Sequence, residues 1–180
     1  MDRRLALSAL IALPALPASA GLEVGTMAPE FSLQAARAGQ VFRFSLREVL
    51  AQGPVVLYFF PAAYSEGCSV EARTFAEAID DFRAAGAFVV GVSSDDLPTL
   101  TSFSRQACQG KFPVASDADQ RVMKSYDAVM QTRPEYATRI SFVIAQDGRI
   151  VYTYKNLEPT RHVERTVAAV RLLARDAAKQ

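Results

Sequence analysis

Histidine and cysteine are scarce in this chain of 180 residues, which contains one His and two Cys. Two cysteines are too few for a disulfide-rich scaffold or a four-cysteine zinc site, and a single histidine argues against a histidine-based metal centre. Net charge is also small, because 20 basic residues face 19 acidic ones, and nothing in the composition favours a nucleic-acid partner. The two thiols, Cys68 and Cys108, are therefore the first place to look for chemistry.

The first twenty residues, 1–20, have the pattern of a secretory signal peptide. Arg3 and Arg4 precede an apolar run at 5–16, and the small residues Ala18 and Ala20 suit a cleavage site. The run is too short to span a bilayer and has no polar face that would suggest an amphipathic helix. We therefore expect an exported protein, in the bacterial periplasm and without a membrane partner, whose thiols meet an oxidising compartment where a disulfide can persist.

Residues 21–180 are expected to form one α/β domain. Continuous apolar runs at 54–60 and 87–93 indicate buried strands, and apolar residues at helical spacing follow each of them. Asp147-Gly148 is a favoured turn pair between two further strands. Additional segments are a helix over 72–82 that Gly86 ends, a helix after Asp96 or Pro98, a strand at 112–115, a helix at 120–126, strands at 139–144 and 149–154, and a terminal helix over 163–174. This order predicts a mixed central sheet with helices on both faces, as in a thioredoxin-like layer.

The junction after the first buried strand carries the candidate chemistry. Pro61, Ser65 and Cys68 occur there at relative positions zero, four and seven. Ligand sites of open α/β sheets lie at the carboxyl ends of strands, and a cysteine in the first turn of the next helix gains thiolate character from free N–H groups and the helix dipole. Gly67 allows close approach of a small molecule, and the Ser65 hydroxyl can bond to its oxygens.

Each of these residues also has a structural interpretation. A free cysteine is often a small buried apolar side chain, Ser65 suits a helix N-cap, and Pro61 suits the end of a strand. The combination of the three with Gly67 favours a functional site over these alternatives.

The sequence resembles the peroxiredoxins, whose peroxidatic motif is Pro-x3-Thr/Ser-x2-Cys. Its opening Gly-Thr-Met-Ala-Pro-Glu-Phe is similar to the family's Gly-x-x-Ala-Pro-Asp-Phe. Three other segments resemble the bacterioferritin-comigratory, or Q-type, branch, and the resemblance covers nearly all of residues 21–180. These segments are Gly-Cys-Ser-Val-Glu-Ala-Arg-Thr-Phe at 67–75, Phe-Pro-Val-Ala-Ser-Asp at 112–117 and Arg-Ile-Ser-Phe-Val-Ile at 139–144.

The resemblance implies a thiol-dependent peroxidase acting on hydrogen peroxide and organic hydroperoxides. Cys68 would attack the peroxide and become a sulfenic acid. Ser65, the backbone at Gly67 and the guanidinium of Arg139 would bind the peroxide oxygens, and Arg139 would also stabilise the thiolate. Two further roles follow: Glu71 would hold Arg139 by an ion pair, and Pro61 would shield the sulfur from water. Taken alone, Arg139 suits an exposed charge at a strand start and Glu71 a first-turn carboxylate.

Cys108 is the candidate resolving cysteine that the resemblance implies. Members of several types carry a resolving cysteine in the corresponding helix, whereas the other common position, five residues after the peroxidatic cysteine, holds Arg73 here. Cys108 would form an intramolecular disulfide with Cys68, after local unwinding if the sulfurs lie too far apart. The alternative is a cysteine on a helix face with no role.

Departures from the family refine these expectations. Glu66 stands where the Q-type branch has Pro and adds a negative charge that disfavours the Cys68 thiolate. The sequence lacks the Gly-Gly-Leu-Gly loop and the terminal Tyr-Phe tail of decameric members, which predicts a monomer or simple dimer. No cofactor or metal is expected, and the reductant would be a thioredoxin-like protein or a small thiol.

Other thiol functions fit less well. A thioredoxin-type oxidoreductase needs Cys-x-x-Cys, but position 71 is Glu, and a copper-delivering relative needs Cys-x3-Cys, but position 72 is Ala. A Cys-His hydrolase needs a histidine base, and His162 is expected at the surface or as a cap at the start of the last helix. The alternative that stays open is an exported thioredoxin-like redox sensor or thiol–disulfide protein without peroxidase turnover.

Overall fold

The computed structural model describes residues 21–179, and the predicted signal peptide lies outside these residues. A seven-stranded sheet has the order β2-β1-β5-β4-β3-β6-β7. The strands are β1 (Ser32–Arg37), β2 (Gln40–Ser45), β3 (Val55–Phe59), β4 (Phe88–Ser93), β5 (Val114–Ser116), β6 (Ile140–Ile144) and β7 (Ile150–Lys155). The helices are α1 (Leu46–Leu50), α2 (Glu66–Glu77), α3 (Ile79–Ala84), α4 (Leu97–Gln106), α5 (Arg121–Ser125) and α6 (Pro159–Ala177).

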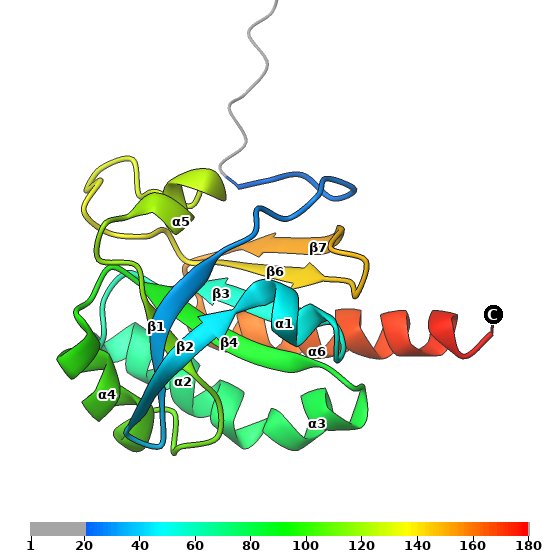
Figure 1. Ribbon diagram of the computed structural model, residues 1–180, viewed down its shortest axis with the longest axis horizontal. Helices are drawn as coiled ribbons and strands as arrows, with labels where there is room; N and C mark the ends of the chain where they lie inside the picture. Colours follow the sequence, from blue (N-terminus) through cyan, green and yellow to red (C-terminus); the bar gives the residue numbers. More distant parts are fainter. Residues whose placement is uncertain (1–20, 180) are drawn as a thin grey trace, which may run out of the picture.

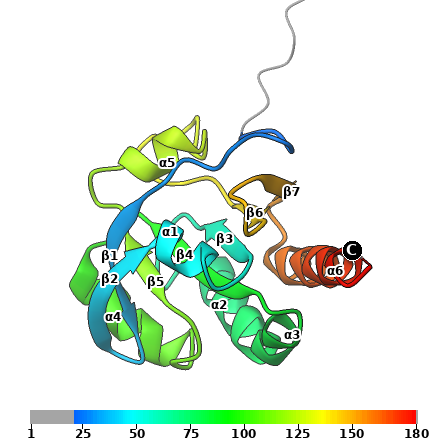
Figure 2. The same ribbon diagram turned by 45° about the vertical axis from the view of Figure 1, so that its right-hand side comes forward.

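Helices cover both faces of the sheet, as Figures 1 and 2 show. β3 is buried along its whole length, and its side chains alternate between two apolar clusters. Val55, Leu57 and Phe59 pack on the side of α1 and α5. Val56 and Tyr58 pack on the side of α2, α3, α4 and α6. The predicted thioredoxin-like α/β fold, with a mixed sheet between two helical layers, is confirmed.

Strand pairing brings segments that are distant in the sequence together at one end of the central strands. β3 pairs with β4 in parallel and with β6 in antiparallel, with Phe59 opposite Val92 on one side and Ile140 on the other. The carboxyl ends of β3 and β4 therefore lie beside the start of β6. This arrangement places the loop after β3, the loop after β4 and the residue before β6 around one point.

The structure differs from the predicted element order at the N-terminal end and in the helices. β1, β2 and α1 precede the first predicted strand and were not predicted. The helix predicted over 72–82 is interrupted at Ala78, which ends α2 and begins α3. α6 begins at Pro159, about one turn before the predicted start at Val163. The Asp147-Gly148 hairpin is confirmed, with β6 and β7 on either side.

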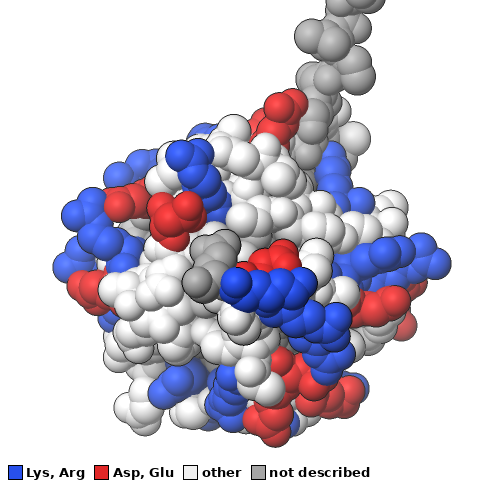
Figure 3. All heavy atoms as spheres, turned by 90° about the vertical axis from the view of Figure 1, so that its right-hand side faces the viewer, with Lys and Arg blue, Asp and Glu red and all other residues white. Residues whose placement is uncertain are grey.

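The charged surface is mixed in sign. On the face shown in Figure 3, basic and acidic side chains are interspersed, and no field of one sign forms there. Such a mixed face offers little attraction to a polyanion, in agreement with the composition. Among residues 21–179, no helix has both the length and the apolar character needed to cross a bilayer.

Candidate active site

The N-terminus of α2 positions Cys68 at the carboxyl end of β3. Cys68 lies in the first turn of α2 and is 1% exposed. N–H groups of a first helical turn lack acceptors within the helix, and the positive end of the helix dipole favours a nearby anion. A thiolate at this position therefore has electrostatic support, and its burial admits only a small molecule to the sulfur.

Arg139 is a second element of the site and contacts the Cys68 sulfur from outside α2. It lies immediately before β6 and is 8% exposed. Its Nη2 donates a hydrogen bond to Cys68 Sγ at 3.3 Å, and its Nη1 donates to Glu71 Oε2. A Cβ on Gly67 would lie 3.1 Å from Arg139 Nη2, so the glycine leaves room for the guanidinium. The predicted grouping of Cys68, Arg139 and Glu71 is present, and the exposed alternative for Arg139 is wrong.

Glu71 places a carboxyl group one helical turn after Cys68, in the interior of the protein. It is fully buried, and Oε1 has no hydrogen-bond partner among residues 21–179. Burial raises the pKa of Glu71 to about 8, against the opposing effect of the Arg139 cation. Glu71 is therefore a structural partner of Arg139 with a strong tendency to hold a proton, rather than the solvated first-turn carboxylate of the alternative interpretation.

Ser65 and Pro61 lie in the loop between β3 and α2. Ser65 occupies the N-cap position of α2, but its hydroxyl donates to the Ala62 carbonyl at 3.0 Å and makes no bond to a helix N–H. The Ser65 side chain is exposed beside the first turn of the helix. Its predicted contact with a bound peroxide, and the shielding role of the half-buried Pro61, stay predictions.

Asp95 holds the loop between β3 and α2 in place. The sequence motifs did not identify it as a site residue. It follows β4, and its Oδ2 accepts hydrogen bonds from the Ala63 N–H and from Ser93 Oγ, each at 2.7 Å. The next residue of the loop, Tyr64, has a left-handed φ of 63° and packs edge-on against Phe103 of α4. Asp95 and Asp96, the acidic pair after the apolar run at 87–93, were the signal that could have indicated this role. Parallel strands bring their carboxyl ends together, so a side chain there can reach the loop after β3.

Cys108 lies just beyond the end of α4 and is fully buried. It belongs to the same apolar cluster as Cys68, and both cysteines are free thiols. The N–H of Cys108 donates to the Phe103 carbonyl at 3.3 Å. Burial raises the pKa of Cys108 well above its ordinary value, which keeps it a thiol in this conformation. A resolving role therefore requires local opening of the end of α4.

His162 is neither a surface residue nor a cap, so this prediction was wrong. It is fully buried and directs Nδ1 toward Glu71 Oε1, 3.9 Å away. The cause is the early start of α6, which places His162 on the face of the helix that packs on the sheet, beside Val163. Burial lowers the pKa of His162 to about 4, so the ring is neutral at neutral pH.

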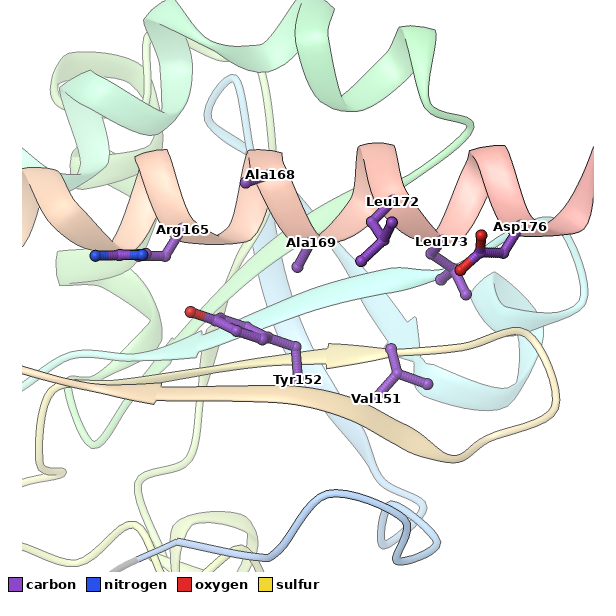
Figure 4. Close-up of a pocket in the computed structure, with 8 residues that line it drawn as sticks. All are labelled: Val151, Tyr152, Arg165, Ala168, Ala169, Leu172, Leu173 and Asp176. Carbon is purple, nitrogen blue, oxygen red and sulfur yellow. The ribbon is translucent and has the colours of Figure 1, made fainter.

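One groove lies away from this site, between β7 and α6. It has a volume of about 430 Å³ and is lined mainly by apolar side chains, with Arg165 and Asp176 toward its opposite ends (Figure 4). Neither cysteine lines it. The groove is therefore a surface feature separate from the thiol chemistry.

Comparison with known proteins identifies the family. The model of the AhpC/TSA family matches residues 24–153. The chain belongs to this family. Two similar relatives are a putative peroxiredoxin of Mycobacterium tuberculosis, 35% identical over 147 residues, and peroxiredoxin Bcp of Escherichia coli, 30% identical over 146 residues. The matches cover 79% and 78% of this chain and 90% of each relative, and they confirm the resemblance to the bacterioferritin-comigratory and Q-type branch.

Solved structures of peroxiredoxins share the fold. Peroxidoxin BcpB from Mycobacterium tuberculosis superposes with a TM-score of 0.73 at 26% identity, covering 84% of this chain and 97% of that one. The reduced 2-Cys peroxiredoxin of Plasmodium vivax has a TM-score of 0.77 at 20% identity, covering 86% and 98%, and is similar in fold alone. The site at Cys68 thus occupies an AhpC/TSA-family fold.

We expect Asp95→Ala to slow the reaction of Cys68 with peroxide by roughly tenfold, because the loop that carries Ala63 and Ser65 loses its anchor. The measurement is the second-order rate constant for Cys68 oxidation under single-turnover conditions. Asp96→Ala is the matched control, since Asp96 caps α4 through the Thr99 N–H and does not bond to the loop. Equal rate constants for the two variants would contradict an anchoring role for Asp95.

We expect the free energy of unfolding to decrease as pH rises from about 6.5 through about 8, because folded Glu71 keeps a proton that the unfolded chain has already released. Between about 4.5 and 6.5 His162 offsets this decrease, because its folded pKa of about 4 lies below its ordinary value and its contribution has the opposite sign. Glu71→Gln should remove this slope, whereas Glu77→Gln, at an exposed position of the same helix, should retain it. Urea unfolding of the three proteins from pH 5 to 9 measures the slope. An unchanged slope in Glu71→Gln would show that another group is responsible.

Proposed function

We propose that this protein is a thiol-dependent peroxidase that reduces hydrogen peroxide and organic hydroperoxides through Cys68. The observation that carries the proposal is the Arg139 guanidinium, which donates to Cys68 Sγ at 3.3 Å at the N-terminus of α2. A cation and a helix N-terminus on one sulfur favour the thiolate, which is the nucleophilic form. Membership of the AhpC/TSA family supports the same reaction.

The reaction is a displacement at oxygen. The Cys68 thiolate forms a bond to one peroxide oxygen, the O–O bond breaks, and the departing oxygen takes a proton to leave as water or an alcohol. Negative charge moves from sulfur along the S–O–O line, so donors already fixed beside this line lower the barrier. Arg139 and the N–H groups of Gly67 and Cys68 are such donors, with the Ser65 hydroxyl adjacent to them.

Cys108 then resolves the sulfenic acid. Once the end of α4 opens, the Cys108 sulfur displaces hydroxide from the Cys68 sulfenic acid, and water and an intramolecular disulfide are formed. A dithiol reductant restores both thiols. This assignment is supported by the shared apolar cluster of the two cysteines and by the absence of any other cysteine in the sequence.

The setting of this cycle is also part of the proposal. The pattern of residues 1–20 supports export to the bacterial periplasm, where a thioredoxin-like protein or a small thiol would supply the electrons. The protein would act as a monomer or simple dimer. Removing residues 1–20 leaves the domain at 21–180 as the working enzyme.

We expect Cys68→Ser to consume peroxide no faster than buffer with dithiothreitol as the reductant, because serine offers no thiolate. Cys108→Ser is the control, since dithiothreitol can reduce the Cys68 sulfenic acid directly and so sustain turnover. The measurement is peroxide consumed per protein over time. Consumption that stops after one equivalent in the parent protein would favour the redox-sensor alternative, and an active Cys68→Ser would exclude Cys68 as the nucleophile.

We expect one equivalent of peroxide to convert the parent protein to a form lighter by two hydrogens, with a peptide that links Cys68 to Cys108. The reason is that displacement of hydroxide by the second thiol leaves a disulfide and releases water. Intact mass and peptide mapping after a short pulse provide the measurement. A sulfenic or sulfinic acid that persists at Cys68 while Cys108 stays free would contradict the resolving role.

A further inference from the structure

In the reaction cycle proposed above, the end of α4 opens so that Cys108 can reach Cys68. Cys108 donates its N–H to the Phe103 carbonyl at 3.3 Å, and the N–H before it, of Ala107, donates to the same carbonyl at 3.0 Å. The Cys108 side chain is fully buried. Release of Cys108 therefore breaks bonds of the last turn of α4, and the contacts that hold this turn decide how readily it opens.

Ser104 lies in the last turn of α4 and bonds to three other parts of the chain. It is fully buried, and its Oγ accepts a hydrogen bond from the Gly39 N–H at 3.0 Å. The same Oγ donates to the Thr101 carbonyl at 2.8 Å. The Ser104 carbonyl accepts from the Gly110 N–H at 2.8 Å. One residue thus joins α4, the loop after Cys108 and the turn between β1 and β2.

The turn between β1 and β2 packs against the same segment. This turn is formed by Ala38 and Gly39, both with left-handed φ, and it lies beside α4 in Figures 1 and 2. A Cβ on Gly39 would lie 2.7 Å from Arg105 Cδ, and a Cβ on Gly110 would lie 3.0 Å from Ala38 Cβ. The turn therefore contacts residues on both sides of Cys108 in the sequence.

Lys111 holds the loop after Cys108 against α2. Its Nζ donates to the Ala76 carbonyl at 3.0 Å. Ala76 lies in the last turn of α2 and Cys68 in the first, so eight residues, a rise of about 12 Å, separate them. The loop is thus held near the end of α2 that is remote from Cys68. A disulfide requires Cα atoms within about 7 Å, so Cys108 has to leave this position to form one.

We propose that Ser104 is a positioning residue for the resolving step, because its hydroxyl ties the last turn of α4 to the β1–β2 turn and holds Cys108 buried until that bond breaks. The inference rests on the peroxidase cycle proposed above. Ser104 acts through the segment that follows it, and among residues 21–179 its hydroxyl bonds to Gly39 and Thr101 and to neither sulfur. A serine with a packing role alone would affect the stability of the whole domain without favouring this opening over others.

Thiol labelling tests the contact without peroxide. In a Cys68→Ser background Cys108 is the single thiol, and N-ethylmaleimide reaches it only when the end of α4 opens. We expect Ser104→Ala to raise the labelling rate roughly tenfold, because the Gly39 N–H loses its acceptor in the closed state, whereas water serves it in the open state. The rate should depend weakly on urea, since a local opening exposes little surface.

Ser102→Ala is the matched control for labelling, because Ser102 is a half-buried serine of α4 that precedes the last turn. We expect it to be labelled at the rate of the protein with both serines. Equal labelling rates in Ser104→Ala and Ser102→Ala would overturn the proposal. A urea dependence as steep as that of global unfolding would also overturn it.

Disulfide formation connects the contact to the cycle. After a pulse of peroxide, acid quenching and mass measurement separate the oxidation of Cys68 from the formation of the disulfide. We expect Ser104→Ala to oxidise Cys68 as fast as the parent and to form the disulfide roughly tenfold faster. An unchanged rate of disulfide formation would overturn the proposal. Faster labelling of Cys108 with no disulfide in any variant would refute the resolving role of Cys108, and not the hold of Ser104 on this segment.

Discussion

The buried contact between the Arg139 guanidinium and the Glu71 carboxyl group is the interaction on which the site depends. Removing ionisable groups from water is expensive, and a buried pair of this kind is weak evidence for stability. Here the pair fixes a guanidinium beside Cys68 in a region that water barely reaches. Low polarity in turn strengthens the attraction between Arg139 and a thiolate. The same burial that makes the pair costly therefore makes it effective.

Sheet topology is what brings the pair together. Glu71 and Cys68 come from one turn of α2, but Arg139 is far away in the sequence and arrives because β6 pairs antiparallel with β3. Asp95 arrives by the parallel pairing of β4 with β3. One central strand thus sets the positions of three loops. Loops fixed in this way present rigid donors to a reacting oxygen, which is the condition for electrostatic catalysis.

The sequence predicts those parts of the structure that repeat a local pattern. β3 and β4 are continuous apolar runs, and the motif around Cys68 has a fixed spacing, so both could be read directly. β2 could not, because it is an edge strand whose side chains are mostly exposed and lack the buried pattern. α1 is only five residues long, which is too short to show a helical spacing of apolar residues. The sheet layer and the cysteine were predictable, and the N-terminal hairpin was not.

Burial of polar side chains was the part of the site that was hardest to predict from the sequence. His162 and Thr166 are one turn apart on α6 and look like a solvated stripe, yet both are fully buried. His162 makes tertiary contacts with Ser141 and Glu71, which no local pattern contains. Asp95 was accessible in principle, because it follows a buried strand that runs parallel to the one before Cys68. Polar groups that satisfy each other across elements are visible only once the register is known.

The position of Cys108 has a consequence for timing. Because its thiol is enclosed by the core at the end of α4, the disulfide proposed with Cys68 would form only after a fluctuation that breaks native packing there. Under this proposal, the local stability of that helix end would set the lifetime of the sulfenic acid. Opening of packed structure accelerates steeply on warming, so heat would shorten this lifetime. Packing of the core at the end of α4 would therefore control the rate of disulfide formation.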